Sequence, residues 1–172
     1  MRDPDPIHVL TALNEALVHR ERAENPEFCT VLLGLLEPDE HGAGLTLATG
    51  GHTPALVLRA DGSAEFCPLP DGQLVGVVPD ARFTRAELRI DAGDTLLLYT
   101  DGLTEARINR RRARYDEDAL HQFVADLAPA QAPDVVRALV NLLAGFGDGI
   151  DDDVAILAIG ILPRHGESST RS

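Results

Sequence analysis

Two groups of aspartates stand where carboxylates can do chemistry, each at one end of an apolar, strand-like segment. Asp101 closely follows the apolar run 96–99, and Asp152 and Asp153 directly precede the apolar run 154–159. A carboxylate in such a place is held by a rigid element yet lies at the exposed rim of a sheet. Hard cations such as Mg²⁺ and Mn²⁺ prefer oxygen ligands, and clustered carboxylates repel one another unless a cation relieves the repulsion. The pattern indicates a site for a divalent cation.

Each acidic group also has a plainer structural interpretation. An Asp-Gly pair after a strand, such as Asp101-Gly102, is common in turns, and an aspartate there often caps a following helix. The acidic stretch 148–153 also fits a solvated loop, and its spacing does not match the EF-hand pattern. The residues by themselves leave the choice between these interpretations open.

A paired-glycine turn precedes a histidine at Gly51-His52, between two predicted strands. Paired glycines indicate a positive φ or a close approach of the backbone. For His52, a hydrogen bond that fixes the turn is favoured over a role as ligand or acid.

One basic cluster interrupts this acidic chain, over residues 107–114. Arg110, Arg111 and Arg112 form its centre. The cluster is either a solvated loop that balances nearby acid or a docking patch for a phosphorylated or acidic partner, because guanidinium groups pair well with phosphate.

The elements that must position these residues follow two periodicities. Helical spacing of apolar residues predicts helices over 7–23, 117–127 and 133–143. Strands are predicted at 28–36, 45–48, 54–58, 64–68, 83–90, 95–99 and 154–159. The nearly continuous apolar run 28–36 is typical of a strand buried on both faces. Because the strands come first and hairpin-length links join most of them, we expect an α+β fold with antiparallel sheet.

Composition excludes several classes of protein. The 172 residues, 44% of them hydrophobic, fit one globular domain over 1–162 and a polar tail over 163–172 that we expect to be disordered. A net charge of −13 argues against a nucleic-acid or anionic-membrane partner. No apolar run approaches the roughly 20 residues that cross a bilayer, and the first residues lack a signal-peptide pattern. We therefore expect a cytoplasmic protein.

The order of the motifs is more specific than any one of them. Residues 93–106 read Gly-Asp-Thr-Leu-Leu-Leu-Tyr-Thr-Asp-Gly-Leu-Thr-Glu-Ala, preceded by Gly-Gly-His-Thr-Pro at 50–54 and followed by Asp-Asp-Val at 152–154. Over residues 7–161 the chain resembles the metal-dependent protein phosphatase (PPM) family in its bacterial SpoIIE-like branch. This resemblance implies two packed antiparallel sheets flanked by helices, an αββα sandwich.

The resemblance also implies an activity and a set of site residues. In that family two divalent cations, Mn²⁺ or Mg²⁺, activate a water that attacks a phosphoserine or phosphothreonine. Asp101 and Asp152 then become metal ligands, Asp153 is the adjacent candidate, and Gly51, His52 and Gly102 lie near the site as structural residues. The implied partner is a phosphorylated regulatory protein, an anti-sigma-factor antagonist.

One departure from the family pattern concerns the start of the domain. The family has upstream strands with an aspartate that bridges both cations, before a Gly-His-Gly motif, and nothing here matches them. The chain therefore resembles an N-terminally truncated domain. Three hypotheses remain. The chain is a phosphatase, or a catalytically incomplete pseudophosphatase or fragment that binds a regulatory partner, or a structural cation-binding module. Missing strands would also leave a sheet edge open to self-association.

Overall fold

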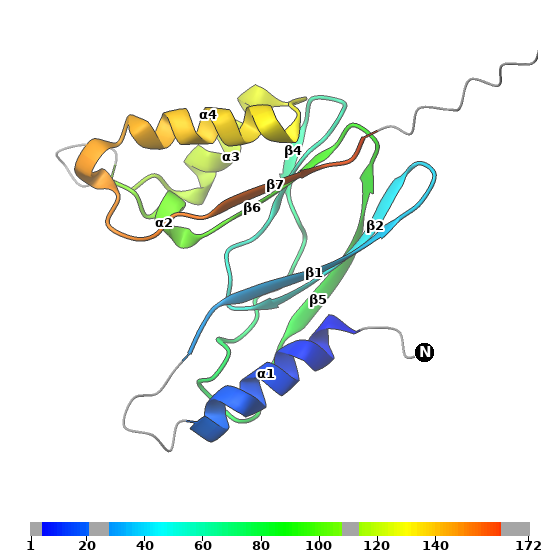
Figure 1. Ribbon diagram of the computed structural model, residues 1–172, viewed down its shortest axis with the longest axis vertical. Helices are drawn as coiled ribbons and strands as arrows, with labels where there is room; N and C mark the ends of the chain where they lie inside the picture. Colours follow the sequence, from blue (N-terminus) through cyan, green and yellow to red (C-terminus); the bar gives the residue numbers. More distant parts are fainter. Residues whose placement is uncertain (1–4, 21–27, 108–113, 163–172) are drawn as a thin grey trace, which may run out of the picture.

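Four layers of helix and sheet make up the structure, a computed structural model that describes residues 5–20, 28–107 and 114–162 (Figure 1). The elements in chain order are α1 (Pro6–Arg20), β1 (Val31–Pro38), β2 (Gly42–Gly50), β3 (Leu56–Leu58), β4 (Ala64–Phe66), β5 (Thr84–Asp91), β6 (Thr95–Tyr99), α2 (Asp101–Thr104), α3 (Glu117–Leu127), α4 (Ala132–Ala144), a 3₁₀ turn (Gly147–Gly149) and β7 (Ile156–Gly160).

The first sheet has the strand order β1-β2-β5, with both pairs antiparallel, and α1 packs against it (Figure 1). β1 lies at the edge, and its residues are half-buried or exposed. The expectation that 28–36 is buried on both faces was therefore wrong. The apolar run in β1 instead makes partial contacts on two sides, with α1 on one and, through Leu32, with the core between the sheets on the other.

The second sheet has the order β4-β3-β6-β7, again antiparallel, and helices α3 and α4 cover its outer face (Figure 1). Alternate side chains of β6 serve two cores, because successive residues of a strand point to opposite faces. Leu96 packs between the two sheets, whereas Leu97 packs under the helices. Both faces of β6 are thus buried, so its ends are held in fixed positions.

The architecture confirms the expected α+β fold with antiparallel sheets. Residues 117–127 form α3 as predicted, and the side chain of Asp116 caps it by accepting the N–H of Ala119 over 2.9 Å. The short helix α2 was not predicted as a separate element. The expected tail 163–172 and the end of the first predicted helix, residues 21–23, lie outside the described residues. None of the described helices is long and apolar enough to cross a membrane.

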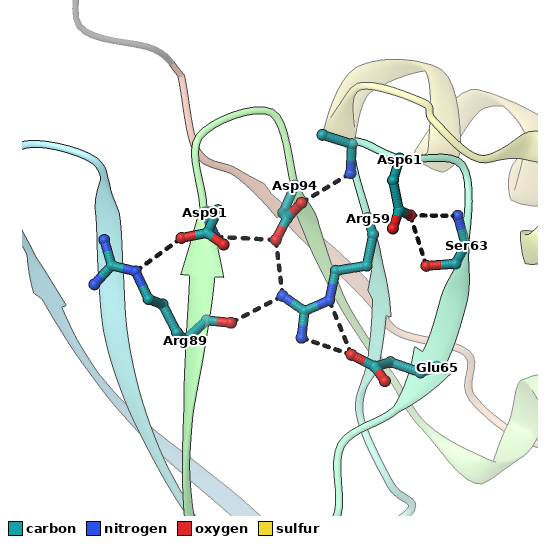
Figure 2. A network of polar contacts seen from close by, with 8 residues as sticks. Arg59, Asp61, Ser63, Glu65, Arg89, Asp91 and Asp94 are labelled. Carbon is teal, nitrogen blue, oxygen red and sulfur yellow. Dashed lines mark hydrogen bonds and ion pairs between the residues drawn. The ribbon is translucent and has the colours of Figure 1, made fainter.

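A buried carboxylate fixes the start of β6 (Figure 2). The side chain of Asp94 is 3% exposed and accepts hydrogen bonds from the N–H groups of Ala60 at 2.8 Å and Asp91 at 2.9 Å. The guanidinium of Arg59 donates to the same carboxylate over 2.8 Å and pairs with Glu65 over 2.6 Å. These bonds join β3, β4, β5 and β6 at the end of the sandwich opposite to α2.

Candidate functional site

β6 leads into the residues that we predicted to carry a metal ligand. Thr100 has an extended backbone, and Asp101 opens the four-residue helix α2. The turn is closed by the N–H of Glu105, which donates to the Asp101 carbonyl over 2.8 Å. Gly102 is buried in this turn, whereas Asp101 is exposed. The strand therefore presents its carboxylate at the rim of the sheet.

The second acidic group is fastened to this turn by Thr100 and Gly102. The hydroxyl of Thr100 donates to the carbonyl of Asp153 over 3.1 Å and accepts the N–H of Ala155 over 2.9 Å. A β-carbon on Gly102 would lie 2.6 Å from the Asp153 carbonyl oxygen, so a larger residue would push the acidic loop away. The structure thus brings all three predicted ligands, 101, 152 and 153, to one rim.

The carboxylates predicted as metal ligands lie exposed at this rim. Asp101, Asp152 and Asp153 are all exposed, and one oxygen of Asp152 accepts the N–H of Asp153 over 2.7 Å. Their oxygen atoms suit a hard cation. Within the part of the chain that the structure describes, however, no group of three or more Asp, Glu, His or Cys side chains is placed to hold an ion. The residues described do not fit a complete two-cation centre, which needs ligands in addition to them.

Two members of the arginine cluster adjoin the same rim. Arg107 and Arg114 are neighbours in an antiparallel bridge. The N–H of Arg107 donates to the carbonyl of Gly149 over 2.8 Å, and its guanidinium pairs with Asp151 over 2.6 Å. Arg114 pairs with Glu105 over 2.8 Å. Arg107 therefore fastens the acidic loop at a second point.

A polar cavity of about 260 Å³ opens between these groups. It is lined by Gly102, Glu105, Arg107, Arg114, Asp151 and Asp152. The predicted docking residues Arg110, Arg111 and Arg112 lie outside the described residues. The basic character of the cluster is nevertheless represented at the site by its two flanking arginines.

The paired-glycine turn lies at the end of β2. Gly51 has a φ of +74°, a conformation that favours glycine. The N–H of His52 donates to the hydroxyl of Thr49 over 3.2 Å. The hydroxyl of Thr53 donates to the carbonyl of Tyr99 over 2.8 Å, and the same hydroxyl oxygen lies 3.0 Å from Nδ1 of His52. These bonds tie the turn to the end of β6.

His52 also lines two hollows in the surface. One, of about 460 Å³, includes Asp71 and Glu117. The other, of about 190 Å³, is a largely apolar groove that includes Leu32 of β1 and Leu157 of β7. The groove therefore lies where the edge strands of the two sheets face each other.

Sequence reasoning missed Thr100 as the residue that joins the two acidic groups. Its hydroxyl bonds residues 53 and 55 positions away, and no local pattern marks such contacts. The ion pair of Arg107 with Asp151 was missed as well, and opposite charge was the only signal for it. The buried position of Gly102 had a weak signal, since glycine often marks a close approach of backbones.

Comparison with known proteins places this geometry in context. A family model described as Stage II sporulation protein E (SpoIIE) matches residues 1–162. Protein IcfG of Synechocystis is 27% identical over 150 residues, which are 86% of this chain and 23% of IcfG. Phosphoserine phosphatase RsbU of Bacillus subtilis is 21% identical over 155 residues, which are 90% of this chain and 44% of RsbU. The chain thus spans less than half the length of either curated relative.

A solved structure shares the fold described above. The structure of the RsbU and RsbW domains of Rv1364c from Mycobacterium tuberculosis superposes with a TM-score of 0.66 at 26% identity, over 90% of this chain and 41% of that one. The αββα sandwich expected from the motifs is thus confirmed as the PPM phosphatase fold. The chain belongs to the SpoIIE family of PPM phosphatase domains.

Proposed function

We propose that this chain is a metal-dependent protein serine/threonine phosphatase, which hydrolyses phosphoserine or phosphothreonine in a protein. The observation that supports it most is the meeting of Asp101 with Asp152 and Asp153 at one rim, held by Thr100 and Gly102. Family membership and the phosphoserine phosphatase named among its relatives support the same reaction class.

We propose Mn²⁺ or Mg²⁺ as the cofactor, with Asp101 and either Asp152 or its neighbour Asp153 among its ligands. Exposed carboxylate oxygens suit both ions. Two solved domains of this fold fit the choice, because one was presoaked with Mn and another was solved in complex with magnesium. The aspartates need at least one further ligand to complete the centre.

We propose as substrate a phosphorylated regulatory protein of the type that antagonises anti-sigma factors. The name of the relative RsbU, a phosphoserine phosphatase, supports a phosphoserine substrate, and the regulatory partner follows from the family resemblance. The net charge of −13 favours a protein over a nucleic acid as the phosphate-bearing partner.

Phosphate release from a phosphoserine protein and from a small aryl phosphate tests the activity, with Mn²⁺, with Mg²⁺ and with EDTA. We expect turnover only with a cation, and Asp101→Ala should lower it at least about a hundredfold, because even an outer-shell residue of a metal site is worth tenfold to a hundredfold.

Asp126→Ala is the matched control. Asp126 is an exposed aspartate of α3 that contacts Gln122, far along the chain from the rim. Equal activity of wild type and Asp101→Ala in the presence of cation would rule out the proposed site.

A second candidate is a pseudophosphatase or fragment that acts as a regulatory protein-binding module. The incomplete ligand set among the described residues favours it. Among the described residues, β1 and β7 are edge strands with the apolar groove between them, which supports the further proposal that the chain self-associates. Cation binding without turnover in the same assay, together with a dimer mass by light scattering, would favour this candidate.

A further inference from the structure

Two guanidinium groups face one small cavity beside the proposed metal ligands. Arg107 and Arg114 line the 260 Å³ cavity together with Asp152 and with Gly102, the neighbour of Asp101. The cavity has several times the roughly 30 Å³ that one water occupies in the liquid, so it has room for a phosphoryl group.

Each guanidinium is held in place yet accessible. Arg107 pairs with Asp151 and Arg114 with Glu105, each through a single nitrogen. The side chains keep 42% and 64% of their surface exposed. A guanidinium carries five N–H donors in a rigid fork, so one ion pair leaves donors for a ligand in the cavity.

The backbone fixes the spacing of the two arginines. They pair across an antiparallel bridge, and the N–H of Arg107 is bonded to Gly149. A β-carbon on Gly149 would collide with the carbonyl oxygen of Arg107, so this contact is as close as a backbone permits. The two charges are therefore presented together by a backbone bridge rather than by independent surface residues.

We propose that Arg107 and Arg114 bind the phosphoryl group of the phosphoserine or phosphothreonine substrate. Paired guanidinium forks match the oxygen atoms of a phosphate and form charge-assisted hydrogen bonds with it. The identity of the anion rests on the proposed function, whereas the basic pair and its cavity do not.

Charge balance gives the proposal a second signature. The cavity carries two guanidinium groups against the carboxylates of Glu105, Asp151 and Asp152. Without a cation these carboxylates oppose an incoming phosphate. Phosphate binding is therefore expected to be tighter in Mg²⁺ than in EDTA, and the two ligands should strengthen each other reciprocally.

Calorimetric titration of the full chain with inorganic phosphate, in Mg²⁺ and in EDTA, tests the proposal. In Mg²⁺, Arg107→Gln and Arg114→Gln should each weaken binding at least about tenfold, as expected for loss of hydrogen bonds to a charged group. Arg114→Lys should recover only part of the loss, because lysine lacks the fork.

Arg137→Gln is the matched control, since Arg137 is an exposed arginine of α4 paired with an aspartate at 2.7 Å. Arg114→Gln is the decisive variant, because Arg107 also fastens the acidic loop and its loss can disturb the fold. Thermal unfolding of each variant separates the two effects.

The outcomes divide cleanly. Phosphate binding that is absent in wild type, or equal in wild type, Arg114→Gln and Arg137→Gln, overturns the proposal. A second titration compares a phosphoserine peptide with the same peptide carrying Glu at that position. Equally tight binding of the two peptides also overturns the proposal. If phosphate binding depends on these arginines but the chain hydrolyses no phosphorylated substrate, this inference is supported while the proposed function fails.

Discussion

β6 has an aspartate at each end, and the two have opposite surroundings. Asp94, just before the strand, is 3% exposed and its carboxylate is bonded to Arg59 and to two backbone N–H groups (Figure 2). Asp101, just after it, is exposed, and no hydrogen bond or ion pair from another described residue reaches its carboxylate. One strand thus holds one carboxylate for the fold and offers the other to solvent.

The difference shows how the same type of side chain can have a structural role in one place and a functional role in another. A buried carboxylate must have its hydrogen bonds supplied by the protein, because an unpaired buried charge is costly. An exposed carboxylate beside other carboxylates carries repulsion that a cation relieves. The comparison therefore assigns stability to the Asp94 end and supports the proposal that the Asp101 end binds a ligand.

The largest expected effect is at the buried end. Asp94→Ala leaves the N–H groups of Ala60 and Asp91 without their acceptor and removes one of the two ion pairs of Arg59, so we expect the free energy of unfolding to fall by about 3 kcal/mol. Urea denaturation at neutral pH in EDTA measures the loss.

Asp61→Ala is the control for this variant. Asp61 lies in the neighbouring hairpin and accepts hydrogen bonds from the N–H and hydroxyl of Ser63, but it is exposed (Figure 2). It should therefore cost much less. Equal losses in the two variants would show that burial does not distinguish Asp94.

The local elements of this comparison were predictable from sequence, and the long-range ones were not. The apolar run 95–99 lies between Gly93-Asp94 and Asp101-Gly102, and turn signals on both sides fix its bounds. The same reasoning places both acidic groups at strand ends. That Asp101, Asp152 and Asp153 bind an ion stays a prediction.

What sequence could not supply is the partner of each group. Arg59 meets Asp94 from 35 positions away, and Thr100 meets Asp153 from 53. Whether a strand lies at the edge of its sheet also depends on long-range contacts. The apolar run in β1 resembles that of a fully buried strand, but burial depends on what lies beside the strand, and among the described strands β2 alone pairs with β1.

A medium effect is expected at the exposed end, and it should appear only with cation. In EDTA, Asp101→Asn should change the free energy of unfolding by less than about 0.5 kcal/mol, as surface substitutions do. At a Mg²⁺ concentration ten times its dissociation constant, the wild type should gain about 1.4 kcal/mol and the variant should not.

Urea denaturation in EDTA and in Mg²⁺ measures this difference. Destabilisation of Asp101→Asn in EDTA as large as that of Asp94→Ala would erase the contrast between the two ends. Equal gains from Mg²⁺ in wild type and variant would place the cation elsewhere.

The smallest expected effect concerns the exposed ion pair of Asp39 with Arg89. It tests whether pairing without burial is enough for a carboxylate to stabilise the fold. Hydrogen bonds from the Arg89 guanidinium and the His41 N–H hold the pKa of Asp39 well below its usual range. A carboxylate whose pKa is lowered by folding stabilises the fold above its unfolded pKa of about 3.9, and this contribution is lost as the pH falls below that value. Wild type should therefore lose stability more steeply than Asp39→Asn between pH 4 and pH 2, by a small margin because Asp39 and Arg89 are exposed.

Urea midpoints of both proteins over that pH range, at low and high salt, check the sign. Identical slopes would mean that pairing without burial adds nothing at this end, which leaves burial as the sole source of the contrast between Asp94 and Asp101.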